Sequence, residues 1–269
     1  MIALKTSSEI DAIAAAGRVL TDLFEAIEHR IAAGLSTADL DAFAEAFIRE
    51  RPGAEPAFKG LYGFPASLCT SINDEVVHGI PSPARVLEDG DIISIDAGVK
   101  LDGWFADMAR TFAVGVIDAD ADRLLDVTQA ALERAIEVAR AGNRIGDIGH
   151  AVQSFAEAEG FNVVRELVGH GLGRAPHEEP QVPNFGAPGR GLTLRPGLVL
   201  AIEPMLNEGT AKVRTLADKW TVVTADQRRS AHFEHTIAIT DSDARVLTSR
   251  NGGRGRARPA EERAGTGEA

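Results

Sequence analysis

Apolar residues recur at spacings of three and four in four segments of the chain, a pattern that predicts amphipathic helices. The first helix begins after Thr6, because Thr6-x-x-Glu9 fits a capping box, and it ends at Gly34. The second begins at Ser36, and the third at Asp118–Asp120, where acidic residues favour a helix N-terminus. The third predicted helix ends at Gly142. The apolar residues of the second predicted helix are Leu40, Phe43 and Phe47, and those of the fourth are Ile148, Val152 and Phe155.

Runs rich in β-branched and aromatic residues follow each pair of helices and predict strands. Because each half of the chain reads as two helices and then strands, we expect a sheet with its helices packed on one side. This is an α+β fold. The predicted strands are Asp91–Lys100, Trp104–Val114, Phe161–Val168, Leu198–Glu203, Trp220–Thr224 and His232–Thr240.

The two halves of the chain resemble each other at a shift of 107 to 108 residues. The pattern A-G-x4-D-[LI] occurs at 33–40 and at 141–148, and the string FAEA follows each copy. The stretch 87–96 also matches 194–203, and both end in a carboxylate, which chance similarity between Ala-rich helices does not explain. The sequence therefore predicts a single domain, 1–249, with duplicated halves at about 1–117 and 118–249.

Composition and charge exclude several classes of protein. The net charge of −12 argues against nucleic acid as the main partner, and the single cysteine, Cys69, excludes an intrachain disulfide and a Cys-cluster metal site. The chain has no long apolar run and no basic-then-apolar N-terminus, so we expect a cytoplasmic protein without a membrane contact. Residues 250–269 contain Arg and Gly but no large apolar side chain and are predicted to be a disordered tail.

Two aspartates flank a predicted hairpin turn in the first half. Asp96 and Asp107 lie on either side of Leu101-Asp102-Gly103. A two-residue loop at 101–102 places the aspartates directly opposite each other, and a loop at 102–103 makes them diagonal neighbours on the same face. A three-residue loop would place the two aspartates on opposite faces, unless a bulge brought them back to the same face. Two adjacent carboxylates on an apolar hairpin require either a proton or a cation between them.

Further acidic residues end apolar strands in the second half. Glu203 follows Leu198–Ile202, and Glu234 lies in a strand-like run. Each acid alone would be read as a salt-bridge partner. Together with Asp96, Asp107 and one imidazole, such as that of the glycine-flanked His170, they form a suitable ligand set for two divalent ions. Oxygen-rich sites with one nitrogen suit Mn²⁺, Fe²⁺ or Co²⁺ at least as well as Zn²⁺.

The sequence resembles a known family, the type I methionine aminopeptidases, over roughly residues 5–248. The resemblance rests on the ordered set Asp96, Asp107, His170, Glu203 and Glu234 and on the strings around it. Those strings are Ser71-Ile72-Asn73, His78-Gly79-Ile80-Pro81, Gly169–Gly173 with His177-Glu178, Ile202–Met205 and Phe233–Thr236. The resemblance implies the pita-bread fold, in which two pseudo-twofold halves surround a dinuclear metal site.

The resemblance also implies roles for individual residues. Asp96 and Asp107 would bind one metal ion, and His170 and Glu203 the other, with Asp107 and Glu234 bridging; Co, Mn, Fe, Zn or Ni are the candidate ions. A metal-bound hydroxide would attack the first peptide bond, with Glu203 as the proton shuttle. The remaining two roles concern the substrate: His177 would stabilise the oxyanion, and His78 would contact the scissile amide nitrogen.

The implied substrate is the N-terminal methionine of nascent polypeptides, preferably before a small second residue, removed near the ribosome by a monomeric enzyme. An apolar pocket for the thioether maps to Phe58, Leu61, Phe64, Cys69 and Trp220, residues that would otherwise be assigned to the core. Leu61-Tyr62, Asp74, Pro176 and His232 depart from the family pattern and affect the expected pocket shape.

Three other readings compete with this one. An X-Pro dipeptidase or aminopeptidase P of the same fold usually has a long N-terminal domain. A non-catalytic relative that binds ribosomes or nucleic acid typically loses metal ligands, and all five are present here. An unrelated dinuclear phosphoesterase would need Arg or Lys near the motifs to bind phosphate.

Overall fold

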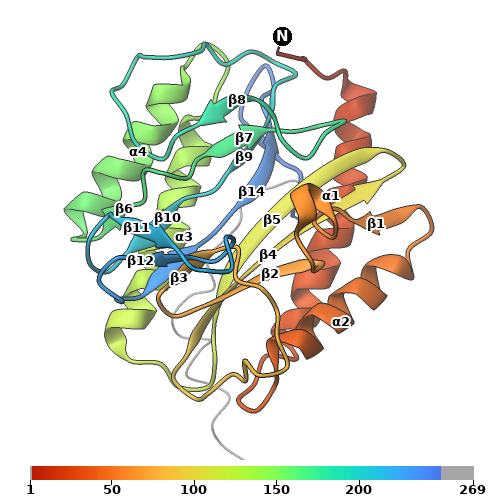
Figure 1. Ribbon diagram of the computed structural model, residues 1–269. Helices are drawn as coiled ribbons and strands as arrows, with labels where there is room; N and C mark the ends of the chain where they lie inside the picture. Colours follow the sequence, from red (N-terminus) through yellow and green to blue (C-terminus); the bar gives the residue numbers. More distant parts are fainter. Residues whose placement is uncertain (1, 250–269) are drawn as a thin grey trace, which may run out of the picture.

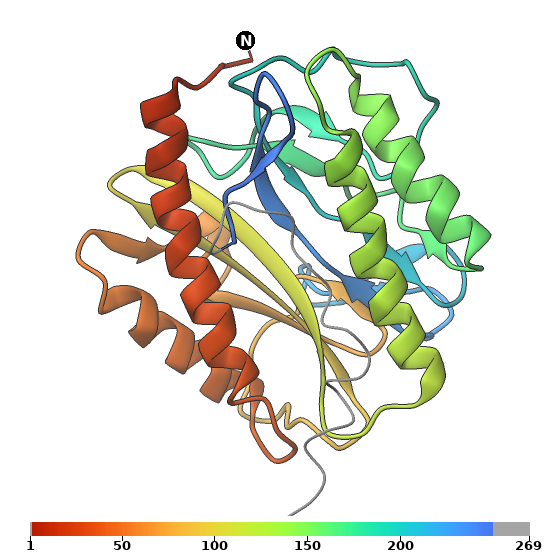
Figure 2. The same ribbon diagram turned by 180° about the vertical axis from the view of Figure 1, so that it is seen from behind.

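Four long α-helices cover one face of the strands, as the two opposite views show (Figures 1 and 2). The computed structural model describes residues 2–249, and the predicted tail at 250–269 lies outside the described residues. The helices on one face confirm the expected α+β layout. Their bounds are α1 Ser7–Glu28, α2 Thr37–Arg49, α3 Ala119–Val138 and α4 Ile145–Ala158.

The helix starts agree with the sequence, whereas two predicted helix ends do not. Thr6 forms the capping box with Glu9, and Ser36 and Asp118 each accept a backbone N–H of the first turn. α1 ends at Glu28 and α3 at Val138, several residues before Gly34 and Gly142. Both glycines have left-handed φ values in the loops beyond the helices. These helix ends were predicted wrongly because a glycine needed for a later turn looked like a helix stop.

The loops after α1 and α3 make matching contacts in the two halves of the chain. The N–H of Gly34 donates to the carbonyl of Leu87, and the N–H of Gly142 donates to that of Leu194. One residue pair beside each of these bonds forms an isolated bridge, 36 with 86 and 144 with 193. The contacts follow the shift seen in the sequence, and the duplication of the halves stays a prediction.

A long hairpin dominates the first half. β4 (Ile92–Leu101) and β5 (Trp104–Ala113) pair from Ile92↔Ala113 to Leu101↔Trp104, so the turn consists of Asp102 and Gly103. Both turn residues have positive φ, 50° and 80°, as a type I′ turn requires. The opposite edge of β4 pairs with β1 (Ala54–Pro56) and β2 (Leu68–Ile72). This register makes Asp96 and Asp107 diagonal neighbours, which is the second of the two loop alternatives.

Several predicted strands of the second half are interrupted or shortened. The predicted strand 232–240 is divided between β13 and β14, and the chain between β9 and β10 breaks at Glu203 and Pro204. The predicted strand 161–168 forms only two residues of β6. The remaining bounds are β3 Glu75–Val77, η1 Leu61–Gly63, β6 Asn162–Val163, β7 Gly169–Gly171, β8 Glu178–Val182, β9 Val199–Ile202, β10 Met205–Asn207, β11 Val213–Thr215, β12 Val222–Thr224, β13 Ser230–His232, β14 His235–Ala238 and β15 Arg245–Val246.

The two halves meet where β5 runs beside the chain that joins β13 to β14. The backbone N–H of Asp107 donates to Oγ1 of Thr236, whose hydroxyl returns a bond to the carbonyl of Asp107. The N–H of Glu234 donates to the carbonyl of Ala109. One apolar core lies between α1, α2 and the β4–β5 hairpin, and a second lies under α3 and α4. The seam between the halves therefore carries acidic side chains from both.

None of the helices within residues 2–249 combines the length and apolar character that crossing a membrane requires.

Candidate metal centre and active site

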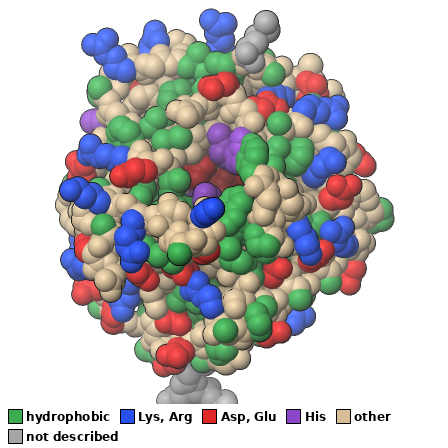
Figure 3. Space-filling view, viewed as in Figure 1, with side chains coloured by type: hydrophobic (Ala, Val, Ile, Leu, Met, Phe, Trp, Pro, Cys, Tyr) green, Lys and Arg blue, Asp and Glu red, His purple; other side chains and the backbone are tan. Residues whose placement is uncertain are grey.

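A cavity of about 560 Å³ opens at the seam between the two halves. Figure 3 shows acidic side chains on the floor of this hollow, histidines at its edge and apolar side chains beside them. All the predicted metal ligands, both predicted catalytic histidines and all the predicted pocket residues line it. These are Phe58, Leu61, Phe64, Cys69, His78, Asp96, Asp107, His170, His177, Glu203, Trp220 and Glu234.

The five predicted metal ligands come from strands and from strand breaks. Asp96 lies on β4, Asp107 on β5 and His170 on β7. Glu203 lies between β9 and β10, and Glu234 lies between β13 and β14. Pro204 has no N–H for the sheet, so the chain leaves the ladder where the Glu203 carboxylate must turn into the cavity. The break at Glu203 agrees with the predicted strand end, whereas the break at Glu234 was not predicted from the sequence.

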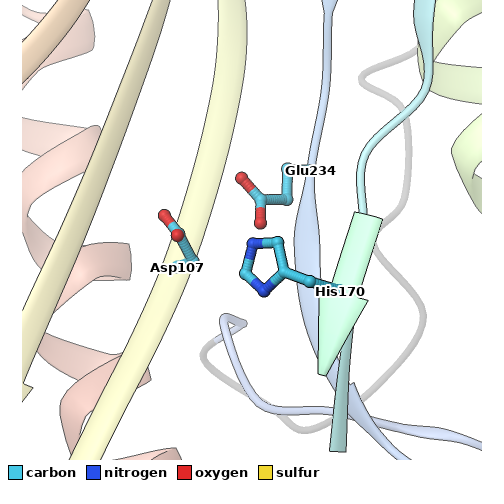
Figure 4. A group of neighbouring side chains, drawn as sticks. All are labelled: Asp107, His170 and Glu234. Carbon is cyan, nitrogen blue, oxygen red and sulfur yellow. The ribbon is translucent and has the colours of Figure 1, made fainter. Parts of the chain in front are cut away.

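Three of these side chains converge on one point. Ligand atoms of Asp107, His170 and Glu234 all lie within 4.8 Å of one another, and the side chains point toward a common space in Figure 4. Nδ1 of His170 lies 2.9 Å from the carbonyl oxygen of Gly171, which can only accept, so Nδ1 carries the proton. Nε2 then keeps its lone pair for a metal ion, as in a typical histidine ligand. The same Nε2 lies 3.6 Å from Oε1 of Glu203.

The carboxylates crowd one another without a protein cation between them. Burial raises the pKa of Asp107 to about 7, and burial together with Asp107 raises the pKa of Glu203 and Glu234 well above the usual range. The pKa of Asp96 is likewise raised, by burial and then by Asp107 and Glu203. Oδ1 of Asp96 and Oε1 of Glu234 have no hydrogen-bond partner. Such unsatisfied buried acids indicate that an ion is needed.

Neighbouring histidines do not supply the missing positive charge. Nε2 of His170 and Nε2 of His232 lie 3.6 and 3.8 Å from the two oxygens of Glu203. Burial lowers the pKa of His170 to about 4 and that of His232 to about 3, so both rings are neutral at pH 7. Among the salt bridges of residues 2–249, none joins a Lys or Arg to the four carboxylates. Four acidic groups and one neutral imidazole fit two divalent ions.

Two further histidines lie around the cavity. The ring centroids of His177 and His170 lie 4.5 Å apart. The Tyr62 ring stacks against the His177 ring, with 5.9 Å between their centroids. Desolvation lowers the pKa of both His177 and His78, so each is neutral near pH 7 and can donate one N–H to a substrate. His78 has a left-handed φ of 60°, a strained conformation typical of functional sites.

The predicted apolar pocket adjoins the acidic floor. Phe58, Phe64 and Cys69 form one buried cluster, and Leu61 and Trp220 pack against it. Phe64 meets the Trp220 ring edge-on at 5.1 Å. Cys69 on β2 pairs with Asp96 on β4, which brings the pocket beside the carboxylates. A long apolar side chain in this pocket would leave its backbone next to the acidic groups.

Three residues at the site, His232, Tyr62 and Thr236, had no function predicted from the sequence. His232 lines the cavity with both ring nitrogens unpartnered, and Tyr62 lies at its edge with a left-handed φ of 50°. Both were noted only as departures from the family pattern. Thr236 holds the backbone of Asp107, a role that only the meeting of β5 and β14 reveals.

Comparisons with known proteins agree with the geometry. Residues 11–241 match metallopeptidase family M24. The chain is 51% identical over 248 residues to methionine aminopeptidase of Clostridium perfringens and to methionine aminopeptidase 1 of Bacillus subtilis, covering 92% of this chain and 99% of each relative.

Solved structures show the same relationship. The crystal structure of methionine aminopeptidase from Thermotoga maritima superposes with a TM-score of 0.91 at 43% identity, over 93% of this chain and all of that one. The prolidase from Pyrococcus horikoshii, at 23% identity and a TM-score of 0.74, shares the fold alone. The chain therefore belongs to metallopeptidase family M24 and, within it, to the methionine aminopeptidases of pita-bread fold.

Proposed function

We propose that this protein hydrolyses the first peptide bond of polypeptides that begin with methionine, preferring a small second residue, and that two divalent ions take part. One observation carries the proposal: four carboxylates without a neutralising cation and one neutral imidazole line the same cavity as an apolar pocket. Nascent polypeptides in the cytoplasm, near the ribosome, are the proposed substrates, and the monomer is the proposed working form.

The proposed ligand roles are those that the family resemblance implies. Asp96 and Asp107 would hold one ion, and His170 and Glu203 the other, with Asp107 and Glu234 shared between them. The mutual proximity of Asp107, His170 and Glu234 supports this division. Co, Mn, Fe, Zn and Ni are all compatible with the donor set. Bound there, such ions activate water and polarise the carbonyl of the scissile bond.

The remaining groups act on the substrate and on its protons. The pocket that contains Phe64 and Trp220 would receive the methionine side chain and fix the scissile bond above the carboxylates. Glu203 would accept the proton of the attacking water and pass it to the leaving amine. The neutral His177 would donate its N–H to the carbonyl oxygen as negative charge develops, and His78 would contact the amide nitrogen.

An assay of free amino-acid release tests this function. Met-Ala-Ser, Met-Leu-Ser, Leu-Ala-Ser and Met-Pro-Ser peptides are incubated with protein that has been treated with chelator and reloaded with each candidate metal. We expect methionine release from Met-Ala-Ser. Little leucine should be released from Leu-Ala-Ser and little methionine from Met-Leu-Ser, whose second residue is bulky, and no peptide should be cleaved without metal. Activity that does not change on chelation, or that is higher on Leu-Ala-Ser than on Met-Ala-Ser, would contradict the proposal.

The methionine pocket can be tested by Phe64→Ala. Removing the ring opens the pocket beside Trp220, and we expect kcat/KM for Met-Ala-Ser to fall at least about tenfold, because apolar contacts contribute roughly 1–3 kcal/mol to such discrimination. Metal affinity, measured by calorimetry, should not change. Phe155→Ala on α4 is the matched control, because it truncates a partly buried phenylalanine outside the cavity. Equal losses in both variants would argue against a pocket at Phe64.

A further inference from the structure

The segment that precedes α1 contacts the turn that carries His177. The ammonium group of Lys5 lies 2.6 Å from Oε2 of Glu178, and the Lys5 side chain is only 6% exposed. The backbone N–H of Lys5 donates to the carbonyl of Gly197, in the loop before β9. Figures 1 and 2 both show the β7–β8 turn reaching across to the start of α1. A residue of the first half thus anchors a turn of the second.

The Glu178 carboxylate joins this anchor to the turn itself. While Oε2 accepts from Lys5, Oε1 accepts the backbone N–H groups of Arg174 and Ala175 at 2.8 and 3.2 Å. His177 lies in the turn between these two residues and Glu178. One charged group therefore fixes the start and the end of the turn, and the lysine fixes that group.

Close packing shows that Lys5 has a defined place in the turn. A Cβ on Gly173 would lie 2.5 Å from Cε of Lys5, so a side chain at residue 173 would displace the lysine stem. The carbonyl of Gly173 also accepts the N–H of Phe105, at 2.9 Å, and the Arg174 guanidinium lies 3.7 Å from the Trp104 ring. The hairpin and the segment before α1 therefore support the turn from two sides.

We propose that Lys5 is a positioning residue for His177, acting through Glu178. The inference rests on the proposed function, in which His177 donates its N–H to the carbonyl oxygen of the scissile bond. Lys5 lines a separate cavity and not the one with the acidic floor, so it acts at a distance from the substrate. Without its ammonium group the turn keeps its backbone bonds to Glu178 and its contacts with the hairpin but loses its ion pair to the segment before α1.

Steady-state kinetics of the metal-loaded full chain test the proposal. We expect Lys5→Met to lower kcat for Met-Ala-Ser by about tenfold to a hundredfold, because small displacements of a catalytic group are costly, with KM changed less than about twofold. Glu178→Gln should lower kcat similarly, and the two changes should not add. Arg245→Met, which removes the exposed ion pair to Asp11 near the same end of α1, is the matched control and should leave kcat unchanged.

A double-mutant cycle separates positioning from general destabilisation. In a His177→Ala background, Lys5→Met should have almost no further effect on kcat, because the group that it positions is gone. Calorimetry should show unchanged metal affinity in the Lys5→Met protein. An equal loss in both backgrounds, or an unchanged kcat in the single variant, would overturn the proposal.

The imidazole NMR signals of His177 give a readout that does not depend on turnover. Lys5→Met should shift and broaden these signals in the metal-loaded protein, and Arg245→Met should leave them in place. Unperturbed signals in the Lys5→Met protein would overturn the positioning role, even if the wild-type protein released no methionine and the proposed function itself failed.

Discussion

Replacing Asp107 with Asn should reduce methionine release from Met-Ala-Ser by about a thousandfold or more, since a metal centre contributes several kcal/mol to such a reaction. Asp107 neighbours Asp96 on the hairpin, and its carboxylate lies within 4.8 Å of ligand atoms of His170 and Glu234. Together with Glu234, it is therefore placed to serve both proposed ion sites. An amide of the same size cannot replace its charge.

The fold should survive this substitution, because the hydrogen bonds between Asp107 and Thr236 use the backbone of Asp107. Asp102→Asn is the matched control: it makes the same chemical change in the turn of the same hairpin. Asn tolerates the left-handed φ of 50° at that position, so activity should be retained. A near-normal rate in the Asp107 variant, measured with saturating metal, would rule out its bridging role.

As the pH rises from about 4 to 7, the metal-free protein should lose stability relative to metal-free Asp107→Asn protein. Burial raises the pKa of Asp107 from an ordinary 3.8 to about 7, and Asp96, Glu203 and Glu234 shift in the same direction. These carboxyl groups then bind more protons in the folded state than in the unfolded state, so their contribution to the free energy of unfolding falls with pH. The buried His170 and His232, whose pKa values are lowered, contribute in the opposite direction, but they do so in both proteins. One pKa unit corresponds to about 1.4 kcal/mol, which makes the expected loss a few kcal/mol.

Denaturant unfolding at a series of pH values, with and without Mn²⁺, measures this loss. Divalent ions should remove the decline above pH 5, because they stabilise the ionised carboxylates and bind only the folded state. Metal-free Asp107→Asn protein should show a smaller decline than wild type. The same pH dependence of stability in metal-free wild type and metal-free Asp107→Asn protein would show that the acids do not crowd one another.

Local sequence signals predicted the starts of elements better than their ends. Ser36 and Asp118 mark helix N-termini because a side-chain oxygen there accepts backbone N–H groups that the helix cannot. Gly34 and Gly142 misled the analysis, because a glycine with positive φ serves any turn and not only a helix C-terminus. The hairpin had two possible registers until the positive φ of Asp102 fixed the turn.

The candidate site was predictable as an inventory but not as an arrangement. Hairpin parity places Asp96 and Asp107 on one face for either two-residue loop, and the observed pairing shows that the loop has two residues. The strand end at Glu203 was predicted, but the break at Glu234 was missed because this acid interrupts a run whose apolar pattern fits a continuous strand. Pocket residues such as Phe64 looked like core, since burial alone does not distinguish a pocket wall from an interior. The contact between Lys5 and Glu178 leaves no sequence signal, because it depends on how the halves pack.

The central claim is that five side chains from distant parts of the chain jointly bind two divalent ions. Anomalous diffraction from crystals of the Mn²⁺-loaded protein tests it most directly. We expect two strong peaks inside the cavity, one beside Asp96 and Asp107 and one beside His170 and Glu203, with Glu234 between them. An anomalous map with no peak among these residues, at saturating Mn²⁺, would contradict the account.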